Sequence, residues 1–421
     1  MLKKACTSLL VAPIFFLASH PQSSELKETV NLQKPHHIEA LAREEALPNT
    51  DLEQRVYEFE DDEFGCKALG CEYESYVVSD FDDFLHYYRE NKSPKITEVI
   101  NPQSKKFINE VQKALHFHGY LGKDPDGVLD EETLDAVKTY KRLNALKGSN
   151  IDKGFVGHIS TSSEVRAKHL ENALRTFGKF DGNNDIYVNI PGFKLRYYYK
   201  GDLEFKMDIV VGTGNLRPRK EGRKKEERWV TEIQEGTLKY AVVNPYWDVP
   251  PGDLTDETRE DLKRSASLRK TMEQLTGGKW VPVDSEVSGK KFRQLPGPWN
   301  SLGRVGYDFN GGYGQFFHGT PQKSLFKNNV RNFSHGCMRL QDEIEFFRKL
   351  QAIGMIDKTL DVNDLIGLTE EGRYKTQYIK LLEPIDVHVV YLQAWINQEE
   401  NGLVMMMPPD IYRYNQKEKP F

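Results

Sequence analysis

The spacing of apolar residues changes near residue 181, and this change divides the chain into two kinds of structure. Before it, apolar residues in 104–177 recur at the three- and four-residue intervals of amphipathic helices. After it, apolar and polar residues alternate, as in half-buried antiparallel strands joined by hairpins. The 421 residues suffice for two or three domains. We therefore expect a multidomain α+β protein in which a helical unit precedes a β-rich domain.

A small three-helix unit is expected at 104–160. Apolar residues in 107–117 keep helical spacing, and a second helix is expected to start near Asp130. A turn is expected at 148–157, followed by a further helix at 164–177.

The β-rich domain is expected over 181–415. Charged residues in 253–275 have helical spacing and indicate an inserted helix over one face, within an insertion of about 253–295. Strands are expected at 186–191, 194–199, 204–212, 240–245, 314–318 and 378–413.

Residues 1–19 have the layout of a secretory signal peptide. Lys3 and Lys4 precede an apolar stretch that ends at Ala18. An uncleaved anchor is the alternative, but the stretch is shorter than the roughly 20 residues that span a bilayer. We expect export to the periplasm or cell envelope, with no stable membrane insertion after signal removal. Residues 20–103 are expected to form an acidic linker with some local structure, because they hold too many aromatic side chains for pure disorder.

The charge balance excludes one class of function. The chain has 58 Lys and Arg against 63 Asp and Glu, a net charge of −5. A protein that coats nucleic acid is usually basic, so no nucleic-acid partner is expected.

The four cysteines are too few for a disulfide scaffold. Cys6 falls within the expected signal. Cys66 and Cys71 are close in sequence with Gly70 between them, and we expect them to form a disulfide in an oxidising compartment. Two free thiols are the alternative. If the two do pair, Cys337 is an odd thiol and a candidate nucleophile.

Two peptides surround this thiol with the residue types of nucleophilic catalysis. One is Phe-Phe-His-Gly-Thr-Pro around His318, and the other is Ser-His-Gly-Cys-Met-Arg-Leu, which includes His335 and Cys337. A free thiol is mostly protonated at neutral pH, so it needs a base such as a histidine on a neighbouring strand. Gly336 lets the backbone approach an acyl carbonyl, so the Cys337 amide can contribute to an oxyanion hole.

Apolar residues at helical spacing follow from Ile344. We therefore expect Cys337 just before a helix start, where the helix dipole favours the thiolate. A buried structural cysteine is the alternative interpretation. The combination of an odd thiol, the Ser-His-Gly-Cys string and the upstream His-Gly favours the nucleophile.

His116 and His118 form a His-x-His pair, but no further ligand is spaced for a metal ion. We interpret them as surface histidines on a helix and expect neither a metal nor a cofactor.

The two catalytic peptides resemble those of the L,D-transpeptidase catalytic domain of the YkuD type, in which a histidine precedes Ser/Thr-His-Gly-Cys. Here 15 residues separate His318 from Ser334, and Arg339 stands where the family often has asparagine. Longer stretches resemble the long-chain branch, which carries a peptidoglycan-binding module and a capping insertion. These stretches are Val111–Leu115, Gly119–Tyr120, Asp126–Gly127, Val188–Pro191, Val243–Pro250 and Gly297–Arg304.

The resemblance implies a role for each residue of the motifs. Cys337 would attack the carbonyl of the third, diaminopimelyl residue of a tetrapeptide donor, and the diaminopimelate amine of an acceptor stem would then form a 3→3 cross-link. The implied roles are general base and acid for His318, oriented by the Gly319 carbonyl; site support for His335; the oxyanion region for Gly336; and substrate binding for Ser334 and Arg339. Peptidoglycan stem peptides are the implied partners, with cell-wall synthases as further candidates.

Three other functions stay open at this point. With water as acceptor, the same residues would make an L,D-carboxypeptidase or an amidase, and a capping insertion that excludes water favours transfer over hydrolysis. A wall-binding protein with an inactive site is less consistent with the intact His318, His335 and Cys337. A papain-like protease is disfavoured because its cysteine precedes its histidine in sequence.

Overall fold

The computed structural model describes residues 76–177, 182–215, 228–399 and 402–414. The expected signal at 1–19 and the expected Cys66–Cys71 disulfide lie outside these residues. The chain divides into two units, Met1–Leu47 and Pro48–Phe421, and the described residues belong to the second. Within them, no helix combines the length and the apolar character needed to cross a membrane.

Helices make up the regular structure of residues 76–177. Their bounds are α2 (Tyr76–Glu90), α3 (Lys105–Phe117), α4 (Glu131–Leu143), α5 (Lys153–Ile159) and α6 (Ser163–Phe177). Side chains of Ser104 and Asp130 cap α3 and α4 by accepting a backbone N–H three residues on. The turn expected at 148–157 is wrong in its second half, because Asp152 caps a further helix, α5, by accepting the N–H of Phe155.

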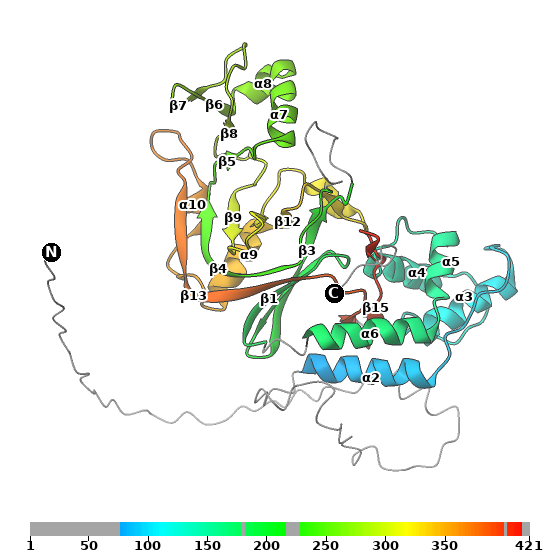
Figure 1. The fold of residues 1–421 in the computed structure, drawn as a ribbon. Coiled ribbons are helices and arrows are strands. Elements are labelled where there is room, and N and C mark those ends of the chain that lie inside the picture. Colours follow the sequence, from blue (N-terminus) through cyan, green and yellow to red (C-terminus); the bar gives the residue numbers. More distant parts are fainter. Residues whose placement is uncertain (1–75, 178–181, 216–227, 400–401, 415–421) are drawn as a thin grey trace, which may run out of the picture. The chain divides into compact units, whose positions relative to one another are not determined.

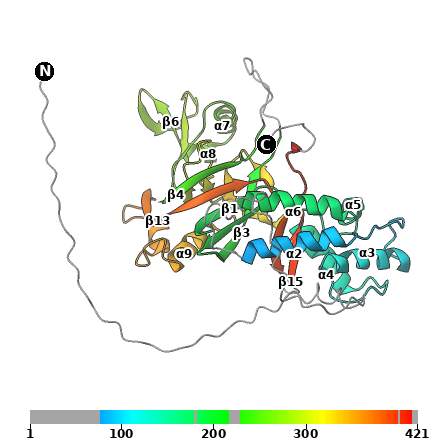
Figure 2. The same cartoon turned by 60° about the horizontal axis from the view of Figure 1, so that its bottom comes forward.

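The described part of the expected acidic linker contains α2, which packs along α6 (Figures 1 and 2). The rings of Phe81 and Phe177 lie 5.9 Å apart, and Arg89 pairs with Glu171 at 2.9 Å. These contacts account for Phe81, which is fully buried.

A nine-stranded mixed sheet forms the body of the β-rich domain, in the order β11-β3-β12-β10-β9-β4-β13-β1-β2. The pairs β1–β13, β10–β12 and β11–β3 are parallel, so the sheet is not purely antiparallel. Strand β3 also pairs with β2, which closes the row of strands on itself. The bounds are β1 (Asn184–Asn189), β2 (Lys194–Tyr199), β3 (Asp202–Gly212), β4 (Gln234–Val243), β9 (Val305–Asp308), β10 (Phe317–His318), β11 (Asn332–Ser334), β12 (Met338–Leu340) and β13 (Gln377–Val390).

One face of this sheet holds the main core. Phe317, Met338 and Leu340 are buried there together with Phe346 and Phe347. The last two lie on helix α9, which runs along this core. The remaining elements are the short helix η3 (Lys323–Lys327), α9 (Glu343–Ala352), α10 (Val362–Ile366) and the hairpin β14 (Trp395–Glu399) and β15 (Gly402–Met406).

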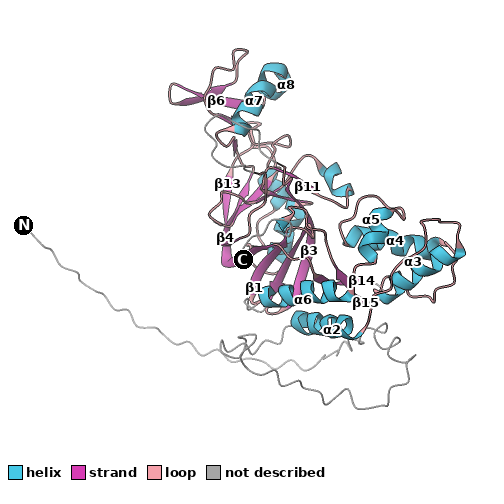
Figure 3. Cartoon of the chain, turned by 45° about the vertical axis from the view of Figure 1, so that its right-hand side comes forward, coloured by secondary structure: helices cyan, strands magenta, loops and turns pink. Residues whose placement is uncertain are grey.

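The expected insertion is helical only in its first part. Strands follow helix α7 (Asp253–Arg264) and the short α8 (Ala266–Arg269), because Met272 and Gln274 are buried at alternate positions, as in a strand. Met272 packs with Leu262 and Phe292 in a small separate core. Figure 3 shows α7 and α8 beside β6. The strands β5 (Trp247–Asp248), β6 (Met272–Thr276), β7 (Lys279–Pro282) and β8 (Phe292–Gln294) form a second sheet in the order β5-β8-β6-β7.

Candidate active site

The two candidate catalytic peptides lie side by side in the main sheet. Strands β10 and β12 are parallel neighbours, with Phe317 opposite Met338 and His318 opposite Arg339. Phe317 and Met338 belong to the core, and strand side chains alternate between faces. His318 and Arg339 therefore lie on the face away from the core, and Cys337 immediately precedes β12.

The helix expected from Ile344 is confirmed, because α9 covers this residue, but Cys337 does not directly precede the helix. The chain continues into β12, and α9 begins only at Glu343, after the capping residue Asp342. The reason is the alternation of Met338 and Leu340, both buried in the core, which favours a strand. The thiol therefore gains no thiolate stabilisation from a helix start at this position.

His318 is 5% exposed, and its Nδ1 lies 2.6 Å from the carbonyl oxygen of Gly319. A carbonyl can only accept a hydrogen bond, so Nδ1 carries the proton and the neutral ring keeps a lone pair on Nε2. Burial, reinforced by the charge of Arg339, lowers the pKa of His318 to about 3. The imidazole is therefore neutral near pH 7 and available as a base.

Cys337 is a partly buried free thiol. Burial raises its pKa, and a hydrogen bond from the Phe316 backbone and the charge of Arg339 oppose this only in part. The resting pair is therefore a thiol and a neutral imidazole, in which the thiol needs a base during attack.

The side chain of Ser334 holds the turn that carries Cys337. Ser334 Oγ donates to the Cys337 carbonyl at 2.7 Å and accepts from the Gly336 amide at 3.1 Å. This buried hydroxyl is used inside the turn, so we assign Ser334 to holding the turn rather than to the substrate contact that the motif implied. Gly336 has φ +135°, and a Cβ there would lie 2.6 Å from the side-chain nitrogen of Gln315.

His335 and Arg339 occupy different surroundings. The His335 side chain is 42% exposed, with its ring 4.6 Å from that of Trp229 and its Nε2 3.7 Å from Glu257 of α7. Arg339 Nη1 donates to Gln322 at 3.1 Å. Its Nε is buried without a hydrogen-bond partner among the residues that the structure describes, so Arg339 retains a donor for a ligand.

Two residues that support the site have no signal in the sequence. The buried Glu343 receives the backbone N–H of Arg304 at 3.1 Å and pairs with Lys323 at 2.6 Å beside Gly319. The buried Thr231 donates to the Gly336 carbonyl at 2.6 Å. Both contacts join segments far apart in the chain, and no local pattern marks either residue.

The interpretation of His118 as a surface residue is wrong. Its ring is buried between helices, with Nδ1 2.9 Å from the Tyr88 hydroxyl and Nε2 3.1 Å from the Ile159 carbonyl. His116 is half-buried, with Nδ1 3.2 Å from the Lys123 carbonyl. In the described segments, no cluster of three or more His, Cys, Asp or Glu side chains has the arrangement of a metal site.

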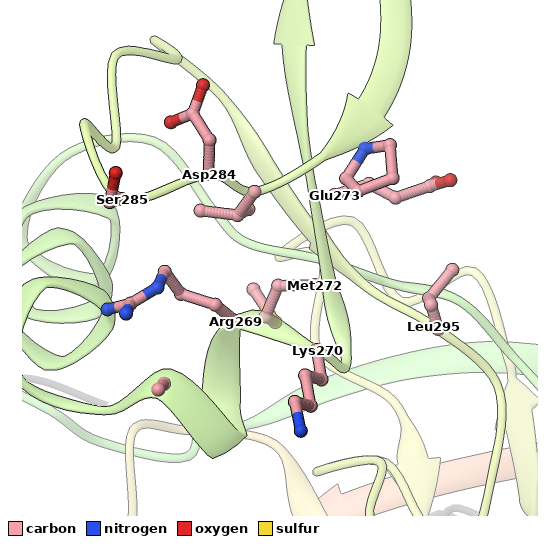
Figure 4. Close-up of a pocket in the computed structure, with 10 residues that line it drawn as sticks. Arg269, Lys270, Met272, Glu273, Asp284, Ser285 and Leu295 are labelled. Atoms are coloured by element: carbon pink, nitrogen blue, oxygen red, sulfur yellow. The ribbon is translucent and has the colours of Figure 1, made fainter.

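A pocket of about 420 Å³ lies within the insertion, away from these residues (Figure 4). Its walls include Arg269, Lys270, Glu273 and Asp284. Neither Cys337 nor His318 lines it, so the candidate active site is defined by the paired strands rather than by this pocket.

Comparison with known proteins relates this part of the chain to a known family. Residues 183–366 match the family model of the L,D-transpeptidase catalytic domain, YkuD. This domain belongs to the L,D-transpeptidase family. The matched residues include the insertion and both candidate catalytic peptides. Strand β13 lies beyond the matched residues, although it pairs with β1 and β4 in the same sheet.

The chain is also similar to a Haemophilus influenzae protein described by inference as an L,D-transpeptidase. The two are 28% identical over 302 residues, which cover 69% of this chain and 57% of that protein. The chain thus spans little more than half the length of this curated relative.

Two solved L,D-transpeptidase structures show weaker similarity. That from Xylanimonas cellulosilytica is 13% identical, with a TM-score of 0.23 over 67% of this chain and 92% of the solved one. That from Enterococcus faecium is 14% identical, with a TM-score of 0.17 over 74% of this chain and all of the solved one.

Proposed function

We propose that this protein forms 3→3 cross-links between peptidoglycan stem peptides through a thioester on Cys337. The observation that carries the proposal is the Nδ1 contact of His318 with the Gly319 carbonyl, on a strand paired with the one that follows Cys337. That contact leaves Nε2 as the only ring nitrogen able to take a proton.

In the first half-reaction, the Cys337 sulfur attacks the carbonyl carbon of the third residue of a tetrapeptide donor while His318 Nε2 takes the thiol proton. The amide bond to the terminal D-alanine then breaks. His318 returns the proton to the leaving amine, which leaves a thioester and a neutral imidazole.

In the second half-reaction, the amine of an acceptor stem attacks the thioester carbonyl. The carbon–sulfur bond breaks, a new amide forms, and the amine proton passes through His318 to restore the thiol. Backbone amides around Gly336 and Cys337 would stabilise the oxyanion in both steps. The unpaired Arg339 Nε is suited to a carboxylate of the stem.

The second candidate function is hydrolysis of the same thioester, which would make the protein an L,D-carboxypeptidase or an amidase. The position of the insertion favours transfer, because Glu257 of α7 reaches His335, two residues from Cys337. An element so close to the thiol can exclude water from the thioester.

Two further assignments belong to this proposal. The helices of 104–160 would bind peptidoglycan and hold the catalytic domain on its polymeric substrate. Export by the segment at 1–19 would place the protein in the periplasm or cell envelope, where carbapenems would acylate Cys337 and cell-wall synthases would be its neighbours.

The deciding experiment incubates the purified protein with disaccharide tetrapeptides and determines the product masses. Cross-linked dimers that lack one terminal D-alanine support transpeptidation, whereas tripeptides without dimers would indicate carboxypeptidase activity. The Cys337→Ala variant is the control. A variant that retained more than a tenth of the wild-type turnover would remove Cys337 from the reaction.

A further inference from the structure

The carbonyl of Gly336 is fixed by a side chain from outside the catalytic motifs. The Thr231 hydroxyl donates to this carbonyl at 2.6 Å and accepts the N–H of Gly212 at 2.9 Å. Because the first partner can only accept and the second can only donate, the direction of the hydroxyl hydrogen is determined. Thr231 is fully buried, so water does not compete for either bond.

The Gly336 carbonyl and the Cys337 amide belong to one peptide group. A trans peptide is planar, and its C=O and N–H point in opposite directions. Holding the oxygen toward Thr231 therefore directs the Cys337 N–H to the other side of the turn. Gly336 alone would not fix this plane, since glycine gives the backbone more freedom than any other residue.

Thr231 is itself held by the C-terminal segment. The Tyr412 hydroxyl accepts the backbone N–H of Thr231 at 3.0 Å and donates to the Gly212 carbonyl at 3.0 Å. Tyr412 is fully buried, and its own amide donates to the Tyr391 hydroxyl at 3.0 Å. The three segments around Gly212, Thr231 and Tyr412 thus form one hydrogen-bonded support beneath the turn.

We propose that Thr231 is a positioning residue for the reaction, which aims the Cys337 amide at the oxyanion, and that Tyr412 holds Thr231 in place. This inference rests on the proposed function, because it assumes an acyl transfer that develops negative charge on a carbonyl oxygen. Removing a donor to such an oxygen costs about 10²–10³ in rate, and a misplaced donor loses part of that.

The test compares two reactions of Cys337 in the full chain. A carbapenem must form a tetrahedral oxyanion when it acylates the thiol, whereas iodoacetamide alkylates the thiolate without one. Mass spectrometry of the peptide that contains Cys337 gives both rates and separates this thiol from Cys6, Cys66 and Cys71. The variants are Thr231→Val, Thr231→Ser and Tyr412→Phe.

We expect Thr231→Val to slow acylation at least tenfold and to change alkylation less than twofold. Thr231→Ser keeps the hydroxyl and should restore acylation to within threefold of wild type, while Tyr412→Phe should give a loss between the two. The matched control is Thr237→Val on β4, whose hydroxyl contacts Asp386 and which should leave both rates unchanged.

Four outcomes overturn the inference. Acylation by Thr231→Val at the wild-type rate would show that the hydroxyl does not aim the amide. Equal losses in acylation and alkylation would assign Thr231 to the thiol or to the fold, as would failure of Thr231→Ser to recover. A wild-type protein that is alkylated at Cys337 but never acylated would instead overturn the proposed function, and this inference with it.

Discussion

The side chain of Glu343 occupies the space that a β-carbon on Gly319 would need. A Cβ at Gly319 would lie 2.1 Å from Glu343 Cδ, far inside van der Waals contact. The carboxylate that fills this space is fixed by Arg304 and Lys323. The residue whose carbonyl orients His318 must therefore be glycine, and the reason is packing, because any residue could supply the carbonyl.

Gly319→Ala should consequently lower the rate of Cys337 acylation at least tenfold, because either the His318–Gly319 segment or Glu343 has to move. Shortening the neighbour in the double variant Gly319→Ala/Glu343→Ala should recover part of this loss. Carbapenem acylation rates for the two single variants and the double variant form the cycle that tests it. Strictly additive losses would show that the two residues do not compete for this space.

The identity of the base can be tested by comparing His318 with His335. We expect His318→Ala to slow acylation about a hundredfold or more, the size of a lost general base. His335→Ala should cost less, because the exposed His335 contacts Trp229 and Glu257 rather than a backbone orienter. Adduct formation followed over time by mass spectrometry measures both. A larger loss for His335→Ala, rescued at high pH, would reverse the two roles.

Acid should weaken the fold through buried histidines. Burial lowers the pKa of His158 and of His318 to about 3, against about 6.5 in the unfolded chain. Between these values the unfolded state binds more protons, so the free energy of unfolding falls as pH falls from 6.5 toward 3. Each histidine contributes a slope of up to about 1.4 kcal/mol per pH unit. The pKa of Asp80 is raised to about 6, so this carboxyl increases the free energy of unfolding as pH falls from about 6 to about 4.

Urea unfolding at pH 7, 5 and 4 measures this dependence. His158→Gln should flatten the curve of the free energy of unfolding against pH, because it removes one of the buried histidines. A His158→Gln curve parallel to that of the wild type would mean that His158 does not contribute.

The helical unit is bonded to the C-terminal segment through Asn144. The Asn144 side chain accepts the amide of Met407 at 2.6 Å and donates to the Tyr120 hydroxyl at 3.0 Å, and it is fully buried. Asn144→Ala should lower the free energy of unfolding by about 2–3 kcal/mol, because it leaves buried polar groups without partners. Urea denaturation gives the value, and Asn172→Ala on α6 is the control. A change below about 0.5 kcal/mol would indicate that the two parts are not energetically joined.

Because of these contacts, deleting residues 104–160 should affect the catalytic domain as well as binding to peptidoglycan. The Tyr120 hydroxyl donates to the Met405 carbonyl, and His158 Nε2 lies 2.7 Å from the Met407 carbonyl. Removing the helices would therefore expose the C-terminal segment that leads to Tyr412, and we expect slower reaction even with small soluble stems. Equal wild-type rates with such stems, combined with weaker binding to sacculi, would show that the unit serves binding alone.

The sequence predicts the local features of this protein and misses the contacts made by tertiary pairing. The motifs around Cys337 and His318 can be recognised because each is contiguous, and the helices α3, α4 and α6 are predicted because their apolar spacing is regular. The strand β12, which separates Cys337 from the expected helix, is missed because two buried side chains, Met338 and Leu340, are too few to show a two-residue period. Thr231 and Glu343 are missed because their partners are distant in the chain and are brought near only by the tertiary fold, which no local pattern encodes.

Replacing the insertion from Val249 to Lys291 with a short glycine-serine linker should shift the products from dimers toward tripeptides. The reason is that water would then reach the thioester more freely. Product masses from disaccharide tetrapeptides give the ratio, and acylation of Cys337 by a carbapenem checks that the site remains intact. An unchanged ratio with an intact site would remove the insertion from acceptor choice.

The chain enters and leaves this insertion at a single point, since Trp247 pairs with Gln294 and Asp248 with Arg293. The insertion also has a core of its own, so its sequence can drift without disturbing the registers that set His318 beside the strand after Cys337. Under the proposed function, a change within the insertion can therefore alter the choice of acceptor without altering the residues that form the thioester.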